Sequence, residues 1–308
     1  MRTRTPILCL LAAAFFRAGP APAAEDTIAD HWHDGLSHGV GHLSRWIDSF
    51  FGNVPVEEER MGNRVRLTPL VEFREGDSPL FKLRLNAKLR LPQFSRRLGL
   101  VFSFFDDEDA AQYGVPGQFS SQDDVRQAAL RYVIEEEARA RLSGDAGLRF
   151  YPEPDPYLRL RWRYRLTEDP VASRVIQYLY WSPRHGWGET TRFEMESKLA
   201  PKTFARSTSA ATWSEISTGV DWSQSFSLWH YFSPRRAVGL DWLTEGYTDP
   251  RLSLGKTRMT FKYRRRVSRD WLFLQVGPFV ELPSDRDFQV TPGLTLQIET
   301  VFGDPPWL

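Results

Sequence analysis

Strict alternation of apolar and cationic residues is the feature of this sequence that most constrains its fold. In residues 80–91, LFKLRLNAKLRL, every second position from Phe81 is apolar and the positions between are cationic or polar. The pattern returns in residues 158–166, LRLRWRYRL. Successive side chains of a strand point to opposite faces, so both stretches predict strands with one apolar and one cationic face. A helical period would scatter the same cations around the whole circumference.

Repeated walls of arginine opposite an apolar face indicate a membrane β-barrel rather than a soluble sandwich. In such a barrel the apolar face meets lipid and the polar face lines a wet interior. The longest apolar run, residues 6–16, falls short of the roughly 20 residues that a spanning helix needs, which excludes a bundle of membrane helices. Aromatic residues suited to interfacial girdles are predicted near strand ends or on the outward face: Trp162, Tyr164, Tyr180, Trp181, Trp187, Trp222, Trp242, Tyr263 and Trp271.

The first 23 residues have the three parts of a secretory signal. A basic start and the apolar residues 6–16 precede an A-x-A cleavage pattern at residues 21–23, which places the cut after Ala23. The only cysteine, Cys9, lies in this segment, so a mature chain without disulfides is predicted. Loss of the three signal arginines turns the formal charge of +1 slightly negative, which argues against nucleic acid as a partner.

Residues 24–60 are predicted to form a periplasmic segment, an amphipathic helix over 25–52 followed by an acidic linker. Apolar residues recur there at spacings of three and four: Ile28, Trp32, Leu36, Val40, Leu43, Ile47 and Phe50. His38 and His42 would share one helix face, as metal-ligating pairs do, with a polar helix face as the alternative. The segment is a candidate to bind a periplasmic partner or to plug the barrel mouth.

Residues 61–303 are predicted to form one closed antiparallel barrel of about 14 strands, or about 12 because 204–230 lacks a clear breaker. Pro69 predicts a bulge or a local distortion in the first strand, and residues 152–156 predict a turn. The strands are expected at 64–73, 80–91, 98–104, 125–135, 138–150, 157–167, 174–182, 189–199, 204–215, 218–230, 237–247, 256–266, 271–281 and 290–302. Residues 304–308 form a C-terminal tail.

The loop at residues 106–124 is the longest and is rich in acidic residues. With an even number of strands, the first strand begins and the last strand ends on the periplasmic side of the membrane. This loop then lies outside the cell. It could hold a divalent cation that bridges to lipopolysaccharide phosphates, or it could be a solvated surface loop; its spacing does not match an EF-hand.

The last strand resembles a known targeting signal. Leu294, Leu296, Ile298 and Phe302 alternate and end in an aromatic residue. This resembles the C-terminal signal by which Gram-negative outer-membrane barrels reach their assembly machinery, with Thr300 and residues 303–308 departing from the pattern. Together with the signal segment and the strand pattern, the chain after about Glu57 resembles an outer-membrane β-barrel protein. The resemblance implies a place in the cell outer membrane, among its lipids and lipopolysaccharide, and contact between residues 294–302 and the assembly machinery; no cofactor is indicated.

Positive charge dominates the face that would line the lumen. The predicted basic residues are Arg64, Arg66, Lys82, Arg84, Lys88, Arg90, Arg139, Arg141, Arg149, Arg159, Arg161, Arg163 and Arg165, joined through barrel closure by Arg258, Lys262 and Arg264. The predicted lumen acids are Glu72, Glu194, Glu196, Asp221 and Asp241. One basic wall and one mixed wall are therefore expected.

Three functions fit this pattern. The first is a passive pore for small anionic solutes through the arginine-lined lumen. The second is a closed structural or assembly barrel whose arginines pair with lumen acids and whose periplasmic helix binds a partner. The third is a lipid hydrolase, for which Ser182 with His185 and Ser233 with His230 are the available pairs. Neither pair sits in a recognisable lipase motif, so no catalytic residue and no enzyme activity are predicted.

Overall fold

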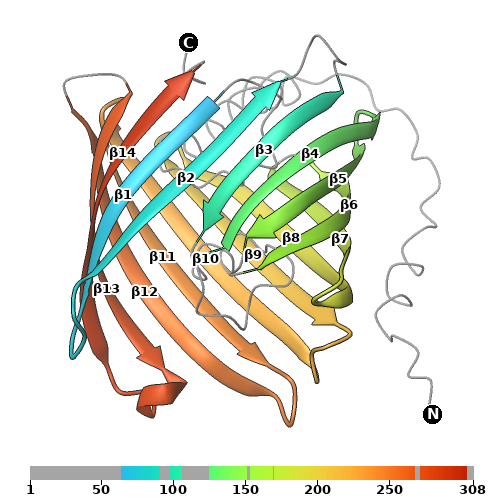
Figure 1. Ribbon diagram of the computed structural model, residues 1–308. Helices are drawn as coiled ribbons and strands as arrows, with labels where there is room; N and C mark the ends of the chain where they lie inside the picture. The colour runs from blue at the N-terminus through green and yellow to red at the C-terminus, as the bar shows by residue number, and fades with distance from the viewer. Residues whose placement is uncertain are drawn as a thin grey trace.

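The described part of the chain forms a closed barrel of 14 antiparallel strands in the computed structural model (Figure 1). The structure describes residues 64–90, 97–105, 125–150, 153–168, 170–267 and 271–303. The strands are β1 (Arg64–Arg74), β2 (Leu80–Arg90), β3 (Leu98–Phe105), β4 (Val125–Glu136), β5 (Ala140–Phe150), β6 (Pro154–Thr167), β7 (Val171–Ser182), β8 (Gly186–Ala200), β9 (Thr203–Ser214), β10 (Val220–Ser233), β11 (Arg236–Tyr247), β12 (Ser253–Arg266), β13 (Leu272–Pro283) and β14 (Thr291–Gly303). A short 3₁₀ turn, η2 (Ser284–Arg286), joins the last two strands.

Each strand pairs with its neighbours in sequence, and β1 pairs with β14 to close the barrel. The prediction of a closed barrel is confirmed, with the larger of the two strand numbers, and the strand ends agree with the predicted ones to within three residues. The signal segment, the helix with His38 and His42, the acidic loop 106–124 and the tail 304–308 lie outside the described residues.

The prediction of a turn at residues 152–156 is wrong, and Pro69 interrupts one ladder locally without making a bulge. β6 begins at Pro154, so residues 154–156 belong to the strand rather than to a turn, and Pro156 pairs with Leu148 of β5. Pro69 makes no bulge, because the register of β1 is continuous through it on both sides. Pro69 has no N–H to donate, and the ladder to β14 skips residues 68 and 69 before it resumes at Leu70 opposite Gln297.

The two faces of most strands differ as predicted, with the apolar face outside. Phe81 is 79% exposed and Leu158 is 57% exposed, whereas Arg159 and Arg161 on the opposite face are only 3% and 4% exposed. This pattern is the reverse of a soluble protein, in which exposed positions are polar. It is the arrangement of a barrel whose exterior faces hydrocarbon and whose interior is polar.

The strand ends define two ends of the barrel. The termini end holds the start of β1 and the end of β14, and the loop end holds the connections that follow the odd-numbered strands (Figure 1). Exposed aromatic side chains occur near both ends: Phe81, Trp187 and Tyr247 near the loop end, and Tyr132, Phe232, Trp271 and Phe302 near the termini end. They suit the two water–lipid boundaries. Tyr180 is an exception to the prediction, because it is only 1% exposed and faces the lumen.

One part of the exterior is polar rather than apolar. On β7 to β10, the hydroxyl of Thr191 donates to Gln177 at 2.6 Å, and Gln224 hydrogen-bonds both Ser207, at 3.0 Å, and Ser209. These side chains satisfy one another's hydrogen-bonding groups across neighbouring strands, which reduces the free-energy cost of exposing polar groups to lipid.

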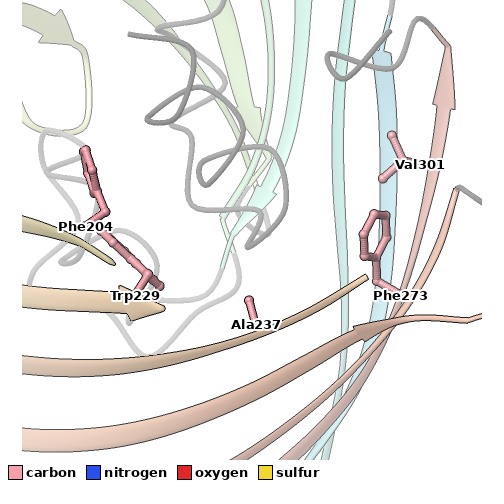
Figure 2. Close-up of a cluster of buried hydrophobic side chains, with 5 residues drawn as sticks. All are labelled: Phe204, Trp229, Ala237, Phe273 and Val301. Carbon is pink, nitrogen blue, oxygen red and sulfur yellow. The ribbon is translucent and has the colours of Figure 1, made fainter. Parts of the chain in front are cut away.

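The lumen also has an apolar patch near the termini end. Its members are Phe204, Trp229, Ala237, Phe273 and Val301, all 5% exposed or less. In Figure 2, Phe204 lies beside Trp229, Phe273 lies beside Val301, and Ala237 lies between the two pairs. The ring centroids of Phe204 and Trp229 are 6.0 Å apart. Arginines line this patch as well, since the Arg206 guanidinium lies 5.4 Å from the Trp229 ring centroid and the Arg264 guanidinium 4.4 Å from that of Phe273.

No helix among the described residues is both long enough and apolar enough to cross a membrane.

Candidate functional site: the charged lumen

A basic strip on β4, β5 and β6 forms one wall of the lumen. The strand register places Arg131, Asp145 and Arg159 in one row across these three strands. Arg131 donates to the Asp145 carboxylate at 2.6 and 2.8 Å, and Arg159 donates to its Oδ2 at 2.6 and 3.0 Å. One carboxylate thus holds two guanidinium groups, so this row keeps an excess positive charge.

Arg149 lies on the same wall, near the loop end of β5, and is held differently. Its side chain is 0% exposed, and its guanidinium carbon lies 4.7 Å from the ring centroid of Tyr157. Its three nitrogens have no hydrogen-bond partner among the described residues. Asp155, opposite Arg149 in the β5–β6 register, makes its contacts elsewhere: it accepts from the Arg184 backbone N–H at 3.3 Å and lies 3.5 Å from His185.

A second network on β7, β8 and β9 is balanced more closely. Glu196 accepts hydrogen bonds from Arg174 at 3.0 Å and from Arg206 at 2.8 Å. Glu194 pairs with both Arg174 and Arg192. Three cations therefore share two buried carboxylates, and the structure supports the prediction that lumen arginines are tied by acidic neighbours.

A third network spans β11 to β1, where the first and last strands meet. Arg258 pairs with Glu281 at 3.4 Å and with Glu72 at 3.2 Å. Glu299 pairs with Arg264 at 2.6 Å and with Arg66 at 3.4 Å. Lys262 pairs with Asp241 at 2.7 Å. Arg258 reaches the first strand through Glu72, but Arg258, Lys262 and Arg264 each meet a carboxylate, so they extend the mixed wall and not the basic one.

The structure places most of the predicted lumen residues on the inner face. Inward side chains that are buried or half-buried are those of Arg66, Lys82, Arg84, Arg141, Arg149, Arg159, Arg161, Arg163, Arg258, Lys262, Arg264, Glu72, Glu194, Glu196, Asp221 and Asp241. Arg64, Lys88 and Arg90 lie in β1 and β2, and their side chains are outside the described part.

Two predicted lumen positions are wrong. Arg139 lies in the exposed turn before β5, because that strand starts only at Ala140. Arg165 lies at the exposed rim, where it pairs with Glu168 at 3.2 Å. Arg165 still pairs in register with Arg174, and the β6–β7 register shifts only after it, so Arg165 is the last residue of the regular ladder and lies at the rim.

Several lumen charges were not singled out from the sequence. They are Arg131, Arg174, Arg192, Arg206, Glu281 and Glu299. The signal that could have found them is the same alternation, since Arg192, Glu194 and Glu196 occupy every second position of one strand. Their strands carry fewer cations, so the pattern is less marked there.

A cavity of about 300 Å³ opens in the lumen at the loop end. Its charged lining residues are Arg74, Asp221, Glu245, Lys256, Glu281 and Asp285. Lys256 pairs with Glu245 at 3.1 Å, and Arg74 lies 3.6 Å from Glu281. The cavity is therefore of mixed charge, unlike the basic strip on the other wall.

The two serine–histidine pairs do not form a proton relay. Ser182 Oγ lies 3.2 Å from His185 Nδ1, and Asp155 lies 3.5 Å from that same nitrogen, whereas a relay needs the two partners on opposite ring nitrogens. Burial, together with nearby Arg149, lowers the pKa of the His185 imidazole. His230 contacts Thr203 at 2.9 Å, and the Ser233 hydroxyl accepts from the Arg235 N–H at 3.3 Å.

No group of three or more His, Cys, Asp or Glu side chains suited to a metal ion occurs among the described residues. The candidate pair His38 and His42 falls outside them.

Known proteins resemble this chain only weakly. Neither protein-family models nor curated proteins match the chain. Among solved structures, a loop L8 deletion mutant of OmpT, an outer membrane protein of Vibrio cholerae, is 12% identical with a TM-score of 0.43, over 78% of this chain and 98% of that one. The outer membrane channel DcaP of Acinetobacter baumannii is 10% identical with a TM-score of 0.46, over 78% and 96%. OccK11 of Pseudomonas aeruginosa is 8% identical with a TM-score of 0.42, over 78% and 95%. These values are too low for the matched proteins to say anything about what this chain does.

Proposed function

We propose that the protein is an outer-membrane β-barrel channel that passes small anionic solutes. The closed barrel and its apolar exterior support insertion in a membrane as a single spanning unit. The signal pattern of residues 1–23 supports export to the outer membrane of a Gram-negative cell.

The observation that carries the proposal is the basic strip. Among the buried residues of β4, β5 and β6, the acids are Asp145 and Asp155, and the arginines are Arg131, Arg149, Arg159 and Arg161. Further positive charge comes from Lys82 and Arg84 on β2 and from Arg141 and Arg163 beside the strip. A basic strip of this kind raises the local concentration of anionic solutes and lowers the free-energy barrier to their passage.

Assembly of the barrel would use its last strand. Leu296, Ile298 and Phe302 are 38%, 47% and 54% exposed on the outer face of β14. That face would be available to the assembly machinery before the strand pairs with β1, and to lipid and lipopolysaccharide afterwards. Residues 25–52 would lie in the periplasm, at the termini end.

Single-channel conductance tests the function directly. The mature protein is refolded and placed in a planar bilayer, with and without residues 25–56, and the reversal potential is measured in a salt gradient. Steady conductance with a bias towards anions is expected from the full chain or, if the N-terminal segment plugs the lumen, from the truncated chain. Silence from both forms, with folding shown by heat-modifiable gel migration, contradicts the proposal.

A closed barrel is the second candidate, and the paired networks favour it. Salt bridges on β7 to β9 and on β11 to β1 cross-link much of the wall. In this case the lumen carries no current and the N-terminal segment acts by binding a periplasmic partner. The same bilayer experiment separates the two functions.

A further inference from the structure

Arg149 is the most unusual charged group in the described lumen. Its side chain is fully buried, and none of its three guanidinium nitrogens has a hydrogen-bond partner among the described residues. Burying an ionised group without hydrogen bonds is strongly unfavourable, so such groups are normally paired. The cation–π contact with Tyr157, at 4.7 Å, offsets part of this penalty but leaves the N–H donors unsatisfied.

The nearby carboxylates are held by other groups. Asp145 is held by Arg131 and Arg159. Asp155 accepts from the backbone N–H of Arg184 and lies near His185, in the turn that joins β7 to β8. Neither acid forms an ion pair with Arg149, although Asp155 is its partner in the strand register. The wall therefore holds one buried guanidinium that has no hydrogen-bond acceptor among the described residues.

We propose that Arg149 and Tyr157 form a binding site for the carboxylate group of a small solute. A planar guanidinium presents parallel N–H donors that match a carboxylate in bidentate geometry. The Tyr157 ring, which also lies 5.8 Å from the Arg159 guanidinium, supplies a flat apolar wall beside the anion. Asp155 stands close by, and its charge disfavours a dianion such as phosphate, so a monocarboxylate is the better match.

The position of Arg149 suits the capture of solutes entering from the loop end. Arg149 is the penultimate residue of β5, a strand that ends at the loop end of the barrel. Arg159, Arg161 and Arg163 follow at alternate positions of β6, towards the termini end. The site adds a ligand class, small carboxylates, to the proposed pore function. It depends on that function only because the solute reaches Arg149 through the pore.

Ligand binding to the refolded full mature chain in detergent tests the site without any need for conductance. The unfolding temperature is followed while sodium acetate or sodium benzoate replaces sodium chloride at constant ionic strength, with inorganic phosphate as a separate series. A saturable rise with the carboxylates is expected, since a ligand that binds only the folded state stabilises it. In Arg149→Gln the apparent dissociation constant is expected to rise about tenfold or more, because a charge-assisted bidentate contact is lost.

Lys262→Gln is the matched control, because it removes one lumen cation that is already paired, with Asp241 at 2.7 Å. It is expected to keep the wild-type response to carboxylates. The site is overturned if wild type shows no saturable response, if Arg149→Gln responds like wild type, or if Lys262→Gln loses the response equally. Tighter binding of phosphate than of the carboxylates overturns the assigned ligand class.

The two proposals fail separately. A protein that binds carboxylates through Arg149 but is silent in a bilayer loses the pore and keeps the site. A protein that conducts anions while its carboxylate response ignores Arg149 keeps the pore and loses the site.

Discussion

Arg258 on β12 donates a hydrogen bond to Glu72 on β1 at 3.2 Å, although β13 and β14 lie between these strands. The two long side chains reach across the inner surface of the barrel where its first and last strands meet. Glu281 on β13 also holds Arg258, at 3.4 Å. The β1–β14 ladder closes the barrel through backbone hydrogen bonds, and we call this closure the seam. A buried salt-bridge network of Arg258, Glu72 and Glu281 thus spans it.

Glu72→Gln is expected to destabilise this seam. Arg258 would lose one of the two carboxylates of this seam and keep Glu281, and Arg74 would lose its 2.9 Å contact with Glu72. A loss of about 1–3 kcal/mol in the free energy of unfolding is expected, which is below the full penalty for a broken buried pair because Glu281 remains. Urea unfolding in detergent measures it. The control is Asp77→Asn, which breaks an exposed pair with Arg286 and is expected to change stability by less than about 1 kcal/mol. Equal effects from the two variants would contradict a structural role for the seam.

Asp145→Asn is expected to lower stability and raise anion preference together. The change leaves Arg131 and Arg159 buried beside each other without their shared counter-charge. The expected loss is about 3 kcal/mol. Adding Arg159→Gln should restore part of it, because one uncompensated charge is removed. Unfolding curves of the single and double variants, with reversal potentials in the bilayer, test both effects; a double variant less stable than Asp145→Asn would argue against charge as the cause.

Arg149→Gln is expected to leave stability unchanged or to raise it. The wild-type side chain buries an ionised group without hydrogen bonds, so its removal relieves a penalty. Arg159→Gln, by contrast, removes a partner of Asp145 and should destabilise the barrel. Thermal unfolding of the two variants in the absence of carboxylates makes the comparison. If Arg149→Gln lost as much stability as Arg159→Gln, Arg149 would have a structural partner.

Leu240→Arg tests the orientation of the barrel wall. Leu240 is 40% exposed on the outer face near the middle of β11, where a cation would face hydrocarbon. A loss of about 2–4 kcal/mol is expected for a cation near the bilayer midplane. Thr260→Arg, on the inner face beside Asp241, should fold normally. Folding yields into lipid vesicles measure the difference, and equal yields would mean that the outer face does not meet lipid.

His185 gives the barrel a predicted pH dependence. Burial lowers the pKa of its imidazole in the folded state below the ordinary value of 6.5, so the folded protein favours the neutral ring. The unfolded chain then binds more protons in acid, and stability present above pH 6.5 is lost as the pH falls through the folded pKa. Wild type should therefore lose more stability than His185→Gln between pH 7.5 and pH 5 (about the range in which histidine titrates). Identical pH profiles would contradict this contribution.

The strands and their faces were predictable because both depend on local sequence. A period of two assigns each side chain to one face whatever its neighbours are, which is why Leu158 and Arg159 were placed correctly. The two errors at strand ends arise because Arg139 lies in the turn before β5 and because the regular β6–β7 ladder ends at Arg165. Both depend on how a strand pairs with its neighbour, which alternation alone does not report.

By itself, the sequence determined that the chain forms a barrel of amphipathic strands with a charged interior, because the alternation of apolar and polar side chains depends only on adjacent residues. Only the tertiary structure decided which charges neutralise one another. Asp145 meets Arg131 and Arg159 because the registers of three strands align them, and Arg258 meets Glu72 because closure brings β12 near β1. Arg149 has no hydrogen-bond acceptor among the described residues, although Asp155 lies opposite it in the β5–β6 register, because Asp155 contacts the β7–β8 turn instead. Pairing depends on distances of a few ångströms between residues far apart in the chain, and strand register and closure set those distances.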